Sequence, residues 1–194
     1  MAGYVYLRLS PPRGLAARAD FVERLKSGAL PGAQPLGLFT AQLGWEASEA
    51  ALLARRDETG PFSLTDPALA TVSETLLLTP TLRPKQASAL QPGGVWVHRR
   101  FDVMAGDVQN FIGLSAMAWA DFEARFEASI FGLFLVDVPA DAPERTLLLI
   151  TRYASHGVWE DSRDPTTEAM QTFQKRAALT LRTSAASTLL IALG

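Results

Sequence analysis

Apolar positions recur at two spacings along the chain, and the spacing switches several times. A period of two predicts β-strands, whereas a spacing of three and four predicts helices. On this basis the first part of the chain is predicted to contain strands at 4–10, 36–45, 50–57 and 74–80, with helices at 15–27 and from Thr65-Asp66-Pro67 onward. Proline suits the start of that helix because a first helical position has no bonded N–H to lose.

The same order of elements is predicted a second time. Strands are expected at 95–103, 130–138, 146–153 and 187–193. Between the first two, apolar residues from Val108 to Phe126 follow helical spacing, with Gly113 and Ser115 as points where the helix could break. Ser155 is predicted to cap a short helix, and Asp164-Pro165 to start a longer one with Met170, Phe173 and Ala177 on its inner face.

Weak internal similarity supports a duplication. Matched residues keep their order in the two parts, and their separation only grows along the chain: Tyr6 with Trp96, Gly37 with Gly132, Leu52 with Leu148, and Thr75 with Thr188. We therefore predict a first half at 1–84, a linker at 85–94 and a second half at 95–194. Each half reads strand–helix–strand–strand–helix–strand, an α+β ferredoxin-like arrangement. Because helices cover only one face of such a sheet, the two sheets are expected to pack face to face.

Alternation along the first strand of each half separates two kinds of side chain. Val5, Leu7 and Leu9 form an apolar set that suits the helix-covered side. The opposite set is aromatic and basic and is predicted to point between the sheets: Tyr6 and Arg8 in the first half, and Trp96, His98 and Arg100 in the second. Either these five residues bind a small molecule, or they fill an inter-sheet core with their polar ends reaching solvent.

His98 is the best single candidate for a general base, with a hydrogen-bonded structural histidine as the alternative. His156 is expected near the surface, and no spacing of histidines and carboxylates indicates a metal site, so no metal or cofactor is predicted. Glu160 and Arg163 can pair, and Arg152 and Arg176 can join them. That group is either an ion-pair network or a set of arginines able to hold an anionic ligand.

Composition excludes several classes of protein. The chain has no cysteine, which removes disulfides, thiolate catalysis and Cys-ligated zinc. The formal net charge is −2, so no basic field favours nucleic acid as a partner. No signal-peptide pattern and no long apolar run is visible, which predicts a cytoplasmic protein without a membrane partner.

Four segments of the second half carry a family resemblance. They are Trp119-Ala120-Asp121-Phe122-Glu123, Ile130-Phe131-Gly132-Leu133-Phe134, Thr151-Arg152-Tyr153-Ala154-Ser155 and Trp159-Glu160-Asp161-Ser162-Arg163. Together with Phe173-Gln174-Lys175-Arg176 they resemble the NIPSNAP family over roughly 94–194. The resemblance implies the dimeric α/β-barrel superfamily, which includes cofactor-free monooxygenases, lactone isomerases, haem proteins and dye-decolourising peroxidases. By that analogy alone, haem could bind through His98.

Three hypotheses about function follow. The first is a NIPSNAP-like protein that binds a small apolar or aromatic molecule between its sheets. The second is a cofactor-independent monooxygenase or isomerase with His98 as proton acceptor. The third is a protein-interaction scaffold, and a homodimer is conceivable because ferredoxin-like sheets keep exposed edges. Whether the protein is an enzyme is left open by the sequence.

Overall fold

The computed structural model describes residues 3–27, 30, 32–56, 70–85 and 90–193. The first half contains β1 (Gly3–Ser10), α1 (Leu15–Lys26), β2 (Ala33–Leu43), β3 (Ala50–Arg56) and β4 (Thr71–Pro80). The second half contains β5 (Val95–Met104), the short 3-10 helix η1 (Ala105–Asp107), α2 (Val108–Arg125), β6 (Ala128–Val136), β7 (Glu144–Tyr153), α3 (His156–Asp161), α4 (Glu168–Ala177) and β8 (Thr180–Ala192). The predicted helix at Thr65-Asp66-Pro67 lies outside the described residues.

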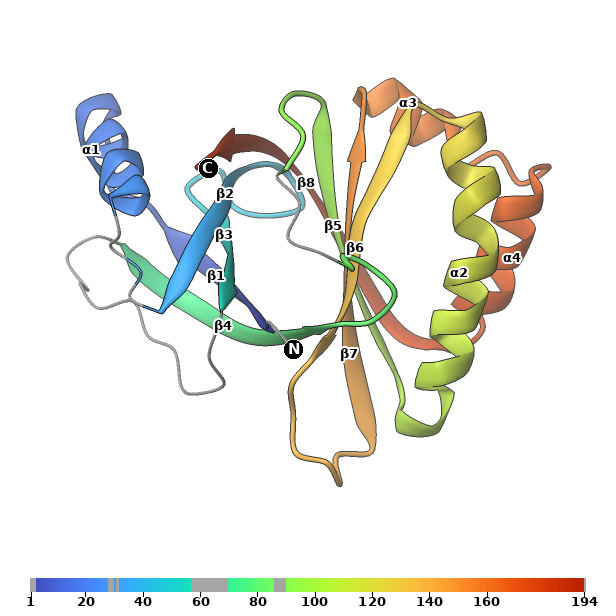
Figure 1. The fold of residues 1–194 in the computed structure, drawn as a ribbon. Helices are drawn as coiled ribbons and strands as arrows, with labels where there is room; N and C mark the ends of the chain where they lie inside the picture. Colours follow the sequence, from blue (N-terminus) through green and yellow to red (C-terminus); the bar gives the residue numbers. More distant parts are fainter. Residues whose placement is uncertain (1–2, 28–29, 31, 57–69, 86–89, 194) are drawn as a thin grey trace.

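The strands form one closed antiparallel barrel in the order β1-β3-β2-β8-β5-β7-β6-β4 (Figure 1). Each half contributes a four-stranded sheet with the same internal order, β4-β1-β3-β2 and β8-β5-β7-β6. The halves join where β2 pairs with β8 and where β4 pairs with β6. The predicted ferredoxin-like tandem fold is therefore confirmed, with two sheets that face each other across one barrel.

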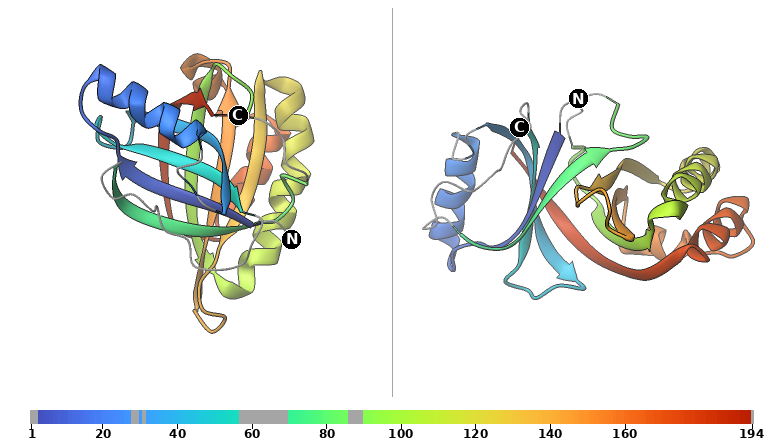
Figure 2. Two further views of the ribbon diagram at one scale, coloured as in Figure 1. Left: turned by 60° about the vertical axis from the view of Figure 1, so that its left-hand side comes forward. Right: turned by 90° about the horizontal axis from the view of Figure 1, so that it is seen from below.

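The molecule is layered, with α1 on the outside of the first sheet and α2 and α4 on the outside of the second (Figure 2). Three apolar clusters fill the spaces between these layers. One cluster packs α1 against the first sheet through Val5, Leu7 and Leu9. A second fills the barrel and includes Tyr6 and Trp96. The third lies between the second sheet and α2 and α4. The alternation in β1 thus separates the helix side from the barrel side, because successive residues of a strand point to opposite faces.

Two helix predictions need correction. The helix expected from Asp164-Pro165 begins at Glu168, because the Asp164 carboxylate accepts bonds from both the N–H and the hydroxyl of Thr166 and closes a turn there. Thr167 is the actual cap, and its hydroxyl accepts from the Met170 N–H. The cap at Ser155 is confirmed, since its hydroxyl accepts from the Val158 N–H at 3.2 Å.

The helix α2 also runs unbroken through Gly113 and Ser115. The Ser115 hydroxyl donates to the Phe111 carbonyl four residues earlier at 2.8 Å, so the buried hydroxyl is satisfied within the helix. In the described ranges, no helix is long and apolar enough to cross a membrane.

The last strand is longer than predicted. β8 begins at Thr180 and pairs with β5 from Thr180 onward before it reaches β2. Its first half, TLRTSAAS, alternates small and polar residues and carries too little apolar signal to be recognised as a strand from periodicity alone. This extension makes β8 the strand that joins the two sheets and forms part of the site described next.

Candidate functional site

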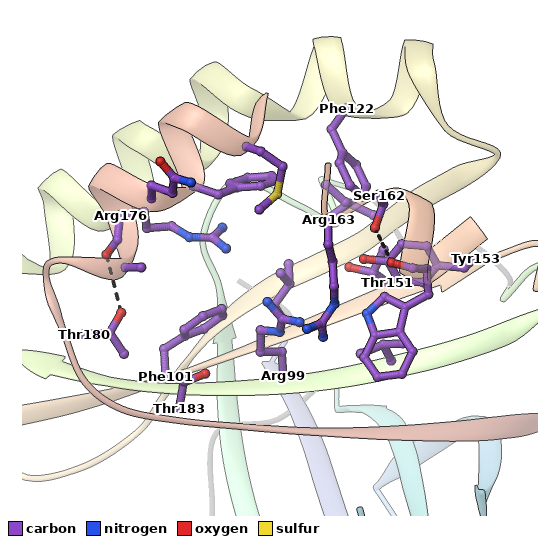
Figure 3. A pocket seen from close by; sticks show the side chains of 18 of the residues that line it. Arg99, Phe101, Phe122, Thr151, Tyr153, Ser162, Arg163, Arg176, Thr180 and Thr183 are labelled. Carbon is purple, nitrogen blue, oxygen red and sulfur yellow. Dashed lines mark hydrogen bonds between the residues drawn. The ribbon is translucent and has the colours of Figure 1, made fainter. Parts of the chain in front are cut away.

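A pocket of about 380 Å³ lies on the helix side of the second sheet (Figure 3). We call it the helix-side pocket. Its floor comes from β5, β6, β7 and β8, its roof from α2 and α4, and its remaining wall from α3 and the residues that follow. The volume falls in the range of small-molecule sites in proteins. Most of the walls are apolar or aromatic: Val97, Phe101, Phe122, Ile130, Leu149, Tyr153, Trp159, Met170 and Phe173.

The motif residues of the second half hold this pocket together. The Asp121 carboxylate accepts from the Ala169 N–H at 3.1 Å, which fixes the start of α4 against α2. The Glu123 carboxylate accepts from the Ile130 N–H at 2.7 Å and from the Arg83 guanidinium at 2.8 Å. These bonds set the position of α4 and β6, and hence of the side chains that they direct into the pocket.

Three arginines enter the helix-side pocket from different elements. Arg99 comes from the middle of β5, Arg163 from the turn after α3, and Arg176 from the last turn of α4. Figure 3 shows Arg163 reaching toward Arg99 while Arg176 points in from the helix. Guanidinium groups are planar and present several donors, so three of them around one space form a binding surface for acidic groups.

Arg176 is the most enclosed of the three, with 4% of its surface exposed. Its guanidinium lies 4.4 Å from the ring centre of Phe173 and 4.9 Å from that of Phe101. It also donates to the Ser115 hydroxyl at 3.2 Å. Cation–π contacts and one neutral hydrogen bond compensate only part of the desolvation of a full charge.

No acidic side chain lines the pocket among the residues that the structure describes. Neither Arg99, Arg163 nor Arg176 has a carboxylate partner within that described part of the chain. Arg182, at the edge, is different because Asp102 and Glu144 neutralise it. The pocket therefore carries an excess of positive charge inside apolar walls.

Burial lowers the pKa values of two of these three arginines. Burial, with a smaller contribution from the nearby Arg99, lowers the pKa of Arg176 to about 9. Burial also lowers the pKa of Arg99, with a smaller contribution from Arg163. Both groups remain charged at neutral pH, yet each would gain from a bound anion. Burial raises the pKa of Tyr153, so its phenol stays protonated.

The predicted ion-pair network around Glu160 is not formed. Arg163 stacks on Trp159, with the guanidinium 4.9 Å from the ring centre, and bonds to Glu160 only through its backbone N–H. Arg152 donates to the Gly93 carbonyl at 3.0 Å. The alternative interpretation, arginines available to an anion, fits the positions of Arg163 and Arg176.

The five residues predicted to bind a ligand point into the barrel. Four of them, Tyr6, Arg8, His98 and Arg100, line a second cavity of about 190 Å³, which we call the barrel cavity. Trp96 lies outside its wall and packs edge-on against Phe39, with ring centres 5.5 Å apart. The barrel cavity is smaller than typical ligand pockets, and a ligand-binding role for these residues stays a prediction.

The charges of the barrel cavity are balanced. The Arg8 guanidinium pairs with Glu49 and lies over Trp45, 4.8 Å from the ring centre. The Arg100 guanidinium pairs with Glu74 at 2.9 Å. Because each cation already has a carboxylate, this cavity does not attract an anion in the way the helix-side pocket does.

His98 is enclosed in the barrel, with 3% of its surface exposed. Its Nδ1 shares a hydrogen bond of 2.9 Å with the Tyr6 hydroxyl, and the rings of Phe39 and Trp45 pack edge-on against the imidazole. Burial lowers the pKa of His98 to about 3. An efficient general base has a pKa near the working pH, so this environment favours the structural interpretation of His98 over the catalytic one.

Haem does not fit the residues of either space. An axial ligand is needed, and no histidine lines the described part of the helix-side pocket, where the phenol of Tyr153 is held in its protonated form. The imidazole of His98 is enclosed by rings beside a cavity of about 190 Å³. His156 lies outside the pocket lining, in a neighbouring groove on the surface, where its Nε2 shares a 3.1 Å bond with the Ser187 hydroxyl. Over the described residues, no group of three or more histidine and acidic side chains is placed to hold a metal ion.

Arg99 is the site residue that the sequence interpretation missed. The helix-side set of β5 is Val95, Val97, Arg99, Phe101 and Val103, so one cation interrupts an otherwise apolar face. The first half has Leu7 at the position that corresponds by strand pairing, and that leucine is fully buried. The sequence did contain a signal for this residue, namely one arginine among the alternate positions of β5 that are otherwise apolar. Because a buried cation needs a compensating partner, such a position is a candidate binding residue.

The fold is a dimeric α/β-barrel fold, built here from one chain. Solved structures that match it along nearly its whole length include an anthrone oxidase-like protein, with a TM-score of 0.67 and 10% identity over 97% of this chain and 91% of the other. A candidate monooxygenase from Lactobacillus acidophilus has a TM-score of 0.63 and 11% identity over 100% and 97% of the two chains.

A candidate chlorite dismutase also matches, with a TM-score of 0.58 and 9% identity over 100% of this chain and 96% of the other. No protein-family model matches the sequence, and no curated protein matches it. These sequence identities are between 9% and 11%, so the matches show a similarity of fold alone.

Proposed function

We propose that this protein is a cofactor-independent monooxygenase that binds an aromatic anion in the helix-side pocket. The observation that carries the proposal is the convergence of Arg99, Arg163 and Arg176 inside aromatic walls without an acidic partner in the described residues. An aromatic anion satisfies both features, because its ring contacts Phe173 and Trp159 while its charge meets the guanidinium groups.

The same cations suit the chemistry. A phenol or enol bound beside Arg99 becomes easier to ionise, since an adjacent positive charge favours the anion. The proton passes to water at the pocket mouth, because the described lining contains neither carboxylate nor histidine to receive it. The resulting electron-rich anion can react with dioxygen directly, and the preorganised guanidinium groups stabilise negative charge as it develops.

The reaction balances without an added reductant. A ring CH₂ conjugated to a carbonyl becomes C=O: two C–H bonds break, one oxygen atom of O₂ becomes the new carbonyl oxygen, and the other leaves as water with the two hydrogens. The substrate loses four electrons and dioxygen gains four. The presence of the same fold in an anthrone oxidase-like protein and a candidate monooxygenase supports this reaction class.

We also propose a relationship to the NIPSNAP family. Its support is that the resembling segments supply pocket residues, namely Phe122, Ile130, Thr151, Tyr153, Trp159, Ser162 and Arg163. A binding protein for a neutral apolar molecule between the sheets is the less favoured alternative, because the barrel is largely filled by its own side chains.

Oxygen uptake tests the proposed function. The purified protein is mixed with 1,8-dihydroxyanthrone in air-saturated buffer, and dioxygen consumption is followed together with the absorbance of the anthraquinone product. We expect one mole of dioxygen per mole of substrate, and a rate at least about tenfold lower in Arg99→Leu, which removes one charge-assisted contact. Arg18→Gln, on the exposed surface of α1, is the matched control and should retain the wild-type rate.

A rate equal to that of buffer alone, or equal rates in wild type and a folded Arg99→Leu, would overturn the proposal. The first half has a buried leucine, Leu7, at the corresponding position, so the variant is expected to fold, and its thermal melt verifies this.

A further inference from the structure

The three arginines are arranged with Arg99 between the other two. Arg163 contributes to lowering the pKa of Arg99, and Arg99 contributes to lowering the pKa of Arg176. Figure 3 shows the same order, with Arg176 at the α4 end and Arg163 on the far side of Arg99. One acidic group held between Arg176 and Arg99 would leave the charge of Arg163 without a partner.

Arg163 also faces a second space. A groove of about 620 Å³ on the surface is lined by Gln42, Leu43, His156, Trp159, Glu160 and Arg163. We call it the entrance groove. It shares Trp159 and Arg163 with the helix-side pocket, so these two side chains form the boundary between the enclosed space and the surface. Arg163 is solvent-exposed, whereas Arg176 is almost fully buried.

The first half of the chain completes this groove. Gln42 and Leu43 come from the end of β2, although every lining residue of the helix-side pocket belongs to the second half. Leu43 is 59% exposed, a large apolar surface for a strand residue beside a tryptophan. A ligand that extends from the pocket across Trp159 would cover it and gain from that burial.

We infer that the ligand carries two acidic groups on opposite edges of an aromatic core. The inner group would bind Arg176 and Arg99, and the outer group would bind Arg163 at the boundary with the entrance groove. Glu160 on the groove wall repels an anion placed further out, which keeps the outer group against Arg163. This inference rests on the proposed function, because it adds a second acidic group to the same aromatic ligand.

Two probes with one core test it. Binding of naphthalene-2-carboxylate and of naphthalene-2,6-dicarboxylate is measured by calorimetry at one fixed ionic strength. With the wild-type protein we expect the dicarboxylate to bind roughly tenfold more tightly, as one additional charge-assisted contact provides. In Arg163→Gln the two probes should bind equally well. Arg176→Gln should lose most of its affinity for both, and Arg18→Gln should behave as wild type.

The outcomes separate the two proposals. If naphthalene-2-carboxylate binds equally well to wild type and Arg176→Gln, the proposed pocket itself is wrong. If its binding requires Arg176 but the dicarboxylate gains nothing, or keeps its gain in Arg163→Gln, only the inference of two acidic groups is overturned. Because Arg163 is exposed and makes no ion pair in the described residues, its replacement should leave the thermal melt unchanged.

Discussion

Arg176 is a charged side chain placed where its burial costs stability. Its guanidinium is buried among Phe101, Phe111 and Phe173, with one hydroxyl as hydrogen-bond partner. Burial is the main cause of its lowered pKa, so the charge is less well solvated here than in water. A protein selected for stability alone would have an apolar residue at this position.

We therefore expect Arg176→Met to unfold at a higher denaturant concentration than wild type. The gain should be on the order of 1 kcal/mol, because an uncompensated charge is replaced by an apolar side chain of similar length. Ser115 is not left unsatisfied, since its hydroxyl still donates to the Phe111 carbonyl. Urea denaturation of both proteins measures the difference, with Arg125→Met on the outer surface of α2 for comparison. A clear loss of stability in Arg176→Met would show that the aromatic contacts outweigh desolvation.

His98 couples the folded state to pH. Its pKa is about 3 in the folded protein and about 6.5 in an unfolded chain, so between these values only the unfolded state binds the proton. The contribution of His98 to the free energy of unfolding is therefore fully present above about pH 6.5, and it is lost as the pH falls toward 3. At pH 4 the loss is about 3 kcal/mol, since each pKa unit corresponds to about 1.4 kcal/mol.

Replacing His98 by glutamine should remove that dependence. We expect the free energy of unfolding of His98→Gln to fall by about 3 kcal/mol less than that of wild type between pH 7 and pH 4. Met117→Gln, at an exposed position of α2 without a titratable group, should keep the wild-type dependence. Equal decreases in wild type and His98→Gln would mean that the imidazole accepts a proton without difficulty in the folded barrel.

At the scale of elements, the order of strands and helices could be predicted because each has a strong period or a specific start signal. Val5, Leu7 and Leu9 define one face of β1, and Ser155 caps α3 as its residue type indicates. The start of β8 could not be predicted, because Ser and Ala residues that pair with a neighbouring strand resemble a loop in sequence.

The duplication was recognised correctly, although two of its matches pair residues on opposite faces. Leu52 faces α1 whereas Leu148 faces the barrel, and the residue that corresponds to Leu148 by strand pairing is Ala51. Thr75 pairs with Leu7 on the helix side, whereas Thr188 pairs with Trp96 on the barrel side. Gly37 and Gly132 do correspond. Each follows an irregularity in strand pairing, and a Cβ there would lie 2.4 Å from Leu190 or 2.6 Å from the Phe134 ring.

The candidate site was harder to predict than the fold. The sequence placed Tyr6, Trp96 and His98 in the barrel, where the structure has them. Residues alternate along a strand in the same way whether the inward side chains fill a core or line a cavity, so the sequence could not distinguish these two cases. The helix-side pocket depends on the tertiary position of α4 relative to β5. Arg99 and Arg176 are 77 positions apart, and no local pattern brings them together.

At the scale of the whole molecule, the two halves have equivalent folds and different charges. The helix side of the first sheet is packed by Val5, Leu7, Leu9 and Phe21 against α1. A buried arginine, Arg56, also lies on this side, but it is the last residue of β3. On the second sheet the buried arginine, Arg99, lies in the middle of β5 and lines the helix-side pocket. The first half therefore acts as a scaffold that closes the barrel and supplies one wall of the entrance groove.

This asymmetry predicts one ligand per chain. Calorimetric titration with naphthalene-2,6-dicarboxylate should give a stoichiometry of one, and native mass spectrometry should show a single adduct per 21.0 kDa chain. Arg176→Gln should show no saturable heat over the same concentrations. Two equivalent sites per chain would contradict the assignment of the pocket to the second half.

The closure of the barrel has a consequence for self-association. A homodimer that extends a sheet needs a strand with a free hydrogen-bonding edge, and the expectation of exposed edges was the reason to consider one. Each of the eight strands that the structure describes has a neighbour on both sides, but some of them only over part of their length. Residues 71–76 of β4 pair with β1 alone, and residues 180–186 of β8 pair with β5 alone. A backbone ladder shared between two copies would therefore have to form at such a partly paired stretch, because the other strand edges are already paired within the barrel.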